Sequence, residues 1–129
     1  MEKLQYPVDI DNLKYGPSSG YMIYCIRNTS NGKIYIGQTR QCLKKRLQAH
    51  RKKPPRKMRA DMESNEQSDQ SWPQTFSVFV LEVVRTSREA NVVESKFIRM
   101  FKSNTSEGYN DPLMVGHPFG RGMYQQLYR

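Results

Sequence analysis

The sequence of 129 residues has few cysteines, one tryptophan and a shortage of acidic side chains. Its two cysteines, Cys25 and Cys42, are too few for a disulfide framework and do not have the spacing of metal ligands. No apolar run approaches the roughly 20 residues that a transmembrane helix needs, and the N-terminus lacks the apolar segment of a secretory signal. These absences exclude disulfide-rich, zinc-binding and membrane-spanning classes, and we expect an intracellular protein.

Basic residues outnumber acidic ones by 21 to 12, which gives a formal net charge of +9. That balance favours an anionic partner, and nucleic acid is the commonest one for a basic domain. From position 40 to 59 there are ten basic residues and no acidic one. Such a run is often only a solvated helix face, but like charges at this density repel one another unless an anion lies along them. We expect DNA-backbone contacts from Arg40, Lys44, Lys45, Arg46, Arg51, Lys52, Lys53, Arg56, Lys57 and Arg59.

The distribution of apolar residues predicts one α+β domain at 21–112, preceded by an extension or arm at 1–20 and followed by a tail at 113–129. Alternating apolar residues predict strands at 21–28, 33–38 and 75–84, and an Asn-Gly turn joins the first two as a hairpin.

Helical periodicity predicts one helix at 41–53 and a second that begins at a Thr86–Glu89 capping box and runs to about Phe101. The polar stretch at 54–75 shows no clear periodicity, which predicts a link without regular structure.

The second predicted strand contains an unusual glycine. Tyr35 and Gly37 share one face of this strand, and its isoleucines lie on the other. A glycine inside a strand costs stability and marks either a β-bulge or a position that another backbone or a ligand approaches closely. We expect Gly37 to lie against bound DNA.

Polar side chains at helical spacing form a second candidate group. Arg46 and His50 are four residues apart and so lie on one helix face. Glu94 interrupts the apolar stripe of the last predicted helix. A carboxylate on a buried face needs a partner, which is either an internal arginine or a metal ion. A lone carboxylate suits Mg²⁺, which retains several waters and shares its coordination with a substrate phosphate.

Together, these features resemble the GIY-YIG nuclease family: MIYCIRNTSNGKIYIGQT at 22–39, RLQAH at 46–50, Glu94, and GYN at 108–110. The steps from Tyr24 to Tyr35 and from Tyr35 to Arg46 are eleven residues each, in the order of the family motifs. One departure is Met22, which stands where the first motif has glycine. The resemblance implies a small three-stranded antiparallel sheet flanked by helices.

The resemblance also implies an activity, that of a DNA endonuclease of homing or restriction type that hydrolyses phosphodiester bonds with Mg²⁺, for which Mn²⁺ can substitute. The catalytic residues it implies are Tyr24, Tyr35, Arg46, His50, Glu94 and Asn110.

In that mechanism Glu94 binds the metal and Arg46 supplies a fixed positive charge to the phosphate. Tyr24 takes the proton from the attacking water, which requires nearby cations to lower its pKa. Tyr35 and His50 orient the water or relay the proton.

The resemblance implies that Asn110 braces the site.

Two alternatives to the homing or restriction endonuclease are a structure-specific repair nuclease and a non-catalytic nucleic-acid-binding module with the same fold. Monomer and homodimer both stay open, and no membrane partner is expected. The resemblance places the protein in the cytoplasm of a bacterium or of a phage-infected cell.

Overall fold

The computed structural model describes residues 20–40, 42–64 and 75–112. Three antiparallel strands form one sheet, as the resemblance implies, and the structure gives their order as β2-β1-β3. The strands are β1 (Tyr21–Asn28), β2 (Ile34–Thr39) and β3 (Phe76–Val84). Apart from Gly20, the predicted N-terminal arm and the predicted tail at 113–129 lie outside the described residues.

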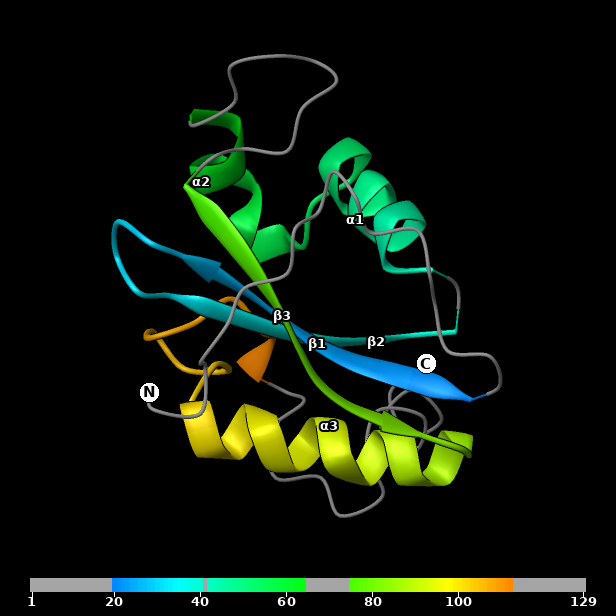
Figure 1. Cartoon of the computed structure of the whole chain (residues 1–129). Coiled ribbons are helices and arrows are strands. Elements are labelled where there is room, and N and C mark those ends of the chain that lie inside the picture. The colour runs from blue at the N-terminus through cyan, green and yellow to red at the C-terminus, as the bar shows by residue number, and fades with distance from the viewer. Residues whose placement is uncertain (1–19, 41, 65–74, 113–129) are drawn as a thin grey trace.

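Helices cover both faces of the sheet (Figure 1). The 15-residue α3 lies along one face, while α1 and α2 lie over the other. The helices are α1 (Leu43–Lys52), the 3-10 helix η2 (Arg56–Met58), α2 (Arg59–Ser64) and α3 (Ser87–Phe101). Within the described parts of the chain, no helix is long and apolar enough to cross a membrane.

The central strand β1 is apolar on both sides because it is buried on both sides. Tyr24 and Ile26 belong to the core beneath α1, whereas Ile23 and Cys25 belong to the core beneath α3. A strand in this position reads as a nearly continuous apolar run, which is what the sequence shows.

The prediction of an unstructured link at 54–75 is wrong for its first half. Residues 56–64 form η2 and α2, and Met58 and Met62 are buried in the core beneath α1. These two methionines are four residues apart, which is the helical spacing, but the surrounding charges obscured it. Residues 65–74 lie outside the described part of the chain.

The capping box predicted at the start of α3 is confirmed. The Thr86 hydroxyl accepts a hydrogen bond from the Glu89 N–H at 3.1 Å, and the Glu89 carboxylate accepts one from the Thr86 N–H at 3.2 Å. At its other end α3 stops at Lys102, which adopts a left-handed conformation with φ 54°.

The segment after α3 returns to the exposed edge of the sheet. Gly108 forms a parallel bridge with Ile34 of β2, and the Tyr109 N–H donates to the Ile34 carbonyl at 2.9 Å. A side chain at Gly108 would collide with the backbone, because its Cβ would lie 2.3 Å from Cα of Ser103. Glycine therefore lets this segment pack closely enough to cover part of the β2 edge.

Candidate active site

Three side chains of the predicted site meet beneath α1. The Tyr24 hydroxyl lies 2.6 Å from Nε2 of His50, and Nε of Arg46 donates to the same hydroxyl at 3.3 Å. Tyr24 comes from β1, while Arg46 and His50 come from one face of α1, as their spacing predicts. The ring of Tyr35 packs edge-on against His50, with centroids 5.3 Å apart. The sequence therefore identified a real cluster formed by two strands and a helix.

The protonation state of Tyr24 differs from the prediction. Burial raises its pKa far above the usual value, and the nearby Tyr35 raises it further. Arg46 lowers this pKa, through its charge and its hydrogen bond, but not enough to offset burial. The phenol is therefore protonated at neutral pH. Since its oxygen accepts from Arg46, we assign its O–H as the donor to Nε2 of His50.

The same cluster shapes the charge of Arg46. Burial lowers the pKa of this guanidinium, but Tyr24, Tyr35 and Glu94 together raise it above its usual value. Arg46 is therefore a permanent cation, held on one side by the Tyr24 oxygen.

Gly37 has a clear structural reason to be glycine. A Cβ atom at this position would lie 2.5 Å from the Tyr24 hydroxyl oxygen and 3.0 Å from the Tyr35 ring. The close approach that the sequence predicted is thus made by two tyrosines of the same domain. Gly37 is buried, and these internal neighbours already explain why the residue is glycine. The DNA contact expected for Gly37 stays a prediction.

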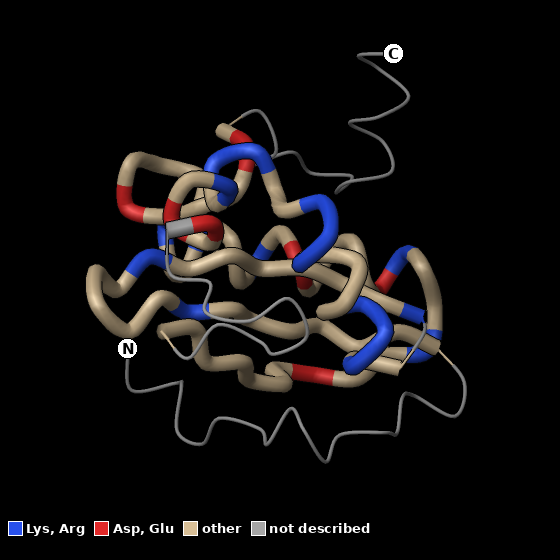
Figure 2. Tube along the Cα trace, turned by 90° about the horizontal axis from the view of Figure 1, so that it is seen from above, with Lys and Arg blue, Asp and Glu red and all other residues tan. Residues whose placement is uncertain are grey.

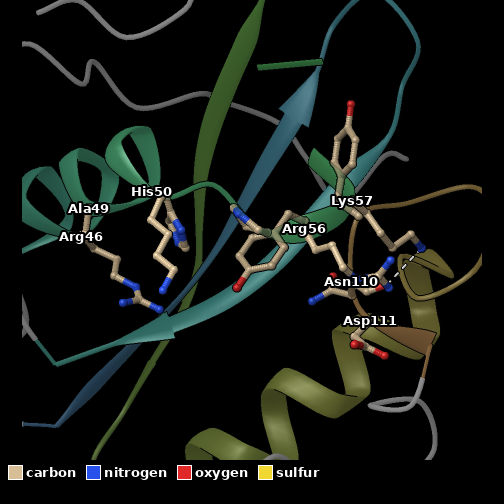
Figure 3. A pocket seen from close by; sticks show the side chains of 11 residues that line it. Arg46, Ala49, His50, Arg56, Lys57, Asn110 and Asp111 are labelled. Atoms are coloured by element: carbon tan, nitrogen blue, oxygen red, sulfur yellow. Dashed lines mark hydrogen bonds between the residues drawn. The ribbon is translucent and has the colours of Figure 1, made fainter. Parts of the chain in front are cut away.

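A cleft of about 390 Å³ opens beside this cluster. Figure 3 shows that α1 supplies one wall through Arg46 and His50, η2 supplies Arg56 and Lys57, and the segment after α3 supplies Asn110 and Asp111. Tyr35 also lines the cleft, whereas Tyr24 is fully buried and does not reach it. A second hollow also borders Arg46 and is lined by Gln38, Thr39 and Arg40. Arg46 is common to both.

The predicted metal ligand Glu94 lies on α3 and is only 1% exposed. Nε2 of Gln38 donates to its carboxylate at 3.0 Å and to Oδ1 of Asn91 at 2.9 Å. The charge of Glu94 nevertheless reaches the cluster, since it raises the pKa values of both Tyr24 and Arg46.

A metal at this position would depend on one carboxylate. In the described segments, no three His, Cys, Asp or Glu side chains lie close enough together to hold a metal ion. A single buried carboxylate beside amide oxygens fits Mg²⁺, which binds to proteins through one or two carboxylates plus substrate phosphates. It does not fit zinc, which takes three or four protein ligands.

Asn110 braces the edge of the site, which is the role expected for it. Its Oδ1 accepts from the Ile36 N–H at 2.8 Å, and its Nδ2 donates to the Ile36 carbonyl at 2.9 Å. The side chain thus pairs with β2 as a neighbouring strand would, and it is 2% exposed. A residue with both groups committed in this way holds the neighbouring backbone in place.

The basic run is not gathered at one site. Figure 2 shows Lys and Arg in several short segments along the trace. Of the ten predicted DNA-contacting residues, four line the cleft and the rest do not. Those four are Arg46, Lys53, Arg56 and Lys57.

This geometry is accompanied by a family match. The model of the GIY-YIG catalytic domain matches residues 20–110, which is more than half of the chain. The chain belongs to the GIY-YIG family. Its described residues accordingly form a nuclease domain.

The GIY-YIG fold is also evident in a comparison of structures. The domain resembles the catalytic domain of intron endonuclease I-TevI, in a mutant form, with a TM-score of 0.55 and 23% sequence identity. The likeness covers 70% of this chain and 92% of that one. No curated protein matches the sequence.

The sequence interpretation missed two polar contacts near the site. Gln38 shares the face of β2 that carries Ile34 and Ile36, so a polar residue on an apolar face was a detectable sign of a partner for Glu94. Asp61 of α2 accepts a hydrogen bond from the Tyr109 hydroxyl at 2.6 Å and one from Asn31 at 3.2 Å. No sequence signal indicated that contact, because α2 itself was not predicted.

Proposed function

We propose that this GIY-YIG nuclease is a Mg²⁺-dependent DNA endonuclease of homing or restriction type. The observation that supports it best is the position of Arg46. Its guanidinium bonds to the Tyr24 oxygen and lines two hollows that carry further basic side chains. A phosphodiester at this position would meet a permanent positive charge next to a group able to transfer a proton.

The chain's own residues suggest a proton route that avoids a free phenolate. The raised pKa of Tyr24 makes the phenolate costly. We propose that substrate binding brings the attacking water to the Tyr24 oxygen, which is buried in the free domain, and that this oxygen takes the proton of the water while its own proton passes to Nε2 of His50, 2.6 Å away. Arg46 stabilises the added negative charge on the phosphate, and Tyr35 orients the water from the cleft wall.

Glu94 would hold the divalent cation in this proposal, with Gln38 fixing its carboxylate. When bound, Mg²⁺ supplies Lewis-acid stabilisation of the charge on the phosphate and on the leaving oxygen, and Mn²⁺ can substitute.

The test is cleavage of supercoiled plasmid with and without Mg²⁺, read as nicked, linear or degraded product. Glu94→Gln should abolish cleavage but leave DNA binding near normal, because the basic residues remain. Glu82→Gln is the matched control, since Glu82 is an exposed carboxylate of β3. If Glu94→Gln cuts as fast as the parent in Mg²⁺, the metal assignment is wrong.

The same assay separates the two alternatives. Preferential cutting of branched or flapped DNA over linear duplex would favour a structure-specific repair nuclease. DNA binding without any cleavage by the parent protein would favour a non-catalytic module.

A further inference from the structure

The four basic residues that line the cleft do not play equal parts. Nζ of Lys57 donates to the carbonyls of Thr105 and Asn110, each at 3.0 Å. These bonds fasten η2 to the segment after α3, and Figure 3 shows the one to Asn110. Lys57 therefore acts as a strut that holds two walls of the cleft together, although the sequence predicted it as a DNA contact.

Lys53 and Arg56 are placed differently. Both are exposed at the cleft, and no residue in the described ranges accepts a hydrogen bond from either side chain. Their donors are thus available to a ligand. Arg56 has five N–H donors in a planar fork that matches phosphate oxygens, and Lys53 adds a compact charge.

The charge of the cleft also favours an anion. Burial lowers the pKa of Lys57, and the neighbouring Arg56 lowers it further, which shows that the cations crowd one another. Asp111 is the one carboxylate among the lining residues, against the four cations. Like charges held this closely cost free energy that a phosphate would relieve.

The size of the cleft limits what it can hold. Its volume of about 390 Å³ is at the lower end of the ~300–1,000 Å³ range of small-molecule sites. That is room for one nucleotide, with Arg46 on one wall and Arg56 on another (Figure 3).

We propose that the cleft binds the nucleotide next to the cleaved bond, with its outer phosphate on Lys53 and Arg56. The inference rests on the proposed function, in which Arg46 holds the phosphate that is cut. The basic run then contributes to a specific subsite for two successive phosphates of one DNA strand. In this proposal the DNA strand continues from Arg46 into the second hollow, which Arg40 also lines.

The probe is thymidine 3′,5′-bisphosphate, which carries two phosphates on one nucleoside, compared with thymidine 5′-monophosphate. Binding is followed by two-dimensional ¹⁵N NMR titration at constant ionic strength and without metal. The parent protein should bind the bisphosphate about tenfold more tightly than the monophosphate, because a second phosphate meets charged donors. Arg46→Ala and Arg56→Ala should each reduce that ratio to near one.

Arg99→Ala is the control, since Arg99 is an exposed arginine of α3 on the opposite side of the sheet. It should leave the ratio unchanged, and the same spectra report whether each variant is folded. The proposal is overturned if the parent binds both probes equally, or if Arg56→Ala retains the preference for the bisphosphate.

The two proposals can fail separately. If the parent protein prefers the bisphosphate but does not cut plasmid, the subsite proposal stands and the nuclease proposal fails. If the parent cuts plasmid in Mg²⁺ but Arg56→Ala leaves the ratio of the two probe affinities unchanged, the nuclease proposal stands and the subsite proposal fails.

Discussion

The two faces of the sheet carry different chemistry although the same strands form both. Toward α1, the strands present the hydroxyls of Tyr24 and Tyr35 among apolar neighbours. Toward α3, the alternate positions present Ile23, Cys25 and Ile36, and the packing is almost wholly apolar. Because successive side chains of a strand point to opposite faces, neighbouring residues lie on different faces. We call the α1 side, which carries the proposed catalytic residues, the reactive face, and the α3 side the supporting face. Activity and stability should therefore respond to different substitutions.

One contact breaks this division. Glu94 and Gln38 are the polar pair on the α3 face, and they lie where the sheet edge meets the site. The charge of Glu94 raises the pKa values of Tyr24 and Arg46, so it acts across the sheet. A buried polar contact on an apolar face thus marks the place where we propose that this face contributes to function.

The largest effect should come from the reactive face. Tyr24→Phe and Arg46→Ala should each lower the single-turnover cleavage rate by about 100-fold or more, because one relays a proton and the other stabilises charge. The double variant should lose much less than the product of the two effects, since both act on one transition state. Quench-flow or gel-based cleavage of plasmid under single-turnover conditions measures these rates.

Tyr24→Phe also tests whether the hydroxyl matters apart from the ring, because phenylalanine fills the same space. It should cost only about 1 kcal/mol of unfolding free energy, from the lost bonds to His50 and Arg46. If this variant cut DNA as fast as the parent, the reactive face would have been misassigned.

A smaller effect is expected at the edge that joins the two faces. Asn110→Ala removes both bonds to the Ile36 backbone and should lower the unfolding free energy by about 2 kcal/mol. Urea denaturation measures this loss. Asn110→Asp serves as the comparison, since it retains an acceptor for the Ile36 N–H but loses the donor, and it should also destabilise. Unchanged stability in both variants would show that Asn110 does not brace the strand.

The smallest effect should come from the supporting face. Ile98→Val removes one buried methyl group beneath the sheet and should cost about 1 kcal/mol of unfolding free energy. Cleavage at 25 °C should stay at the parent rate, because Ile98 belongs to the core on the α3 side. Thermal denaturation and the plasmid assay provide the two readings. A large loss of activity with intact folding would show that the faces are coupled.

The sequence was sufficient where local patterns determine the structure. The hairpin of β1 and β2, the capping box at Thr86 and the pairing of Arg46 with His50 all follow from short-range spacing. The family resemblance added the correct fold and brought Tyr24 into the same cluster. Each of these local features depends on residues close together in the sequence, so a short chain segment is enough to predict it.

The missed features depend on contacts between distant segments. The η2–α2 segment is held by Met58 of η2 and Met62 of α2, in a core that forms only when β1 and β3 pair. The pKa of Tyr24 moves upward because burial outweighs Arg46, and burial cannot be read from the motif alone. In the sequence, Lys57 is one more cation of the basic run. Its two carbonyl partners lie about 50 residues away along the chain, so only the structure shows its bracing role.

The bracing of β2 by residues 108–110 also has a consequence for biosynthesis. A ribosome makes β1, β2 and α1 first, so Tyr24, Arg46 and His50 are present long before the segment that closes the cleft. Contacts across 74 residues, such as that between Ile36 and Asn110, carry a high loop-closure cost, so we expect them to form late. A nascent chain therefore holds most of the proposed catalytic groups in an unfinished pocket, and the site is complete only when the end of the domain has emerged.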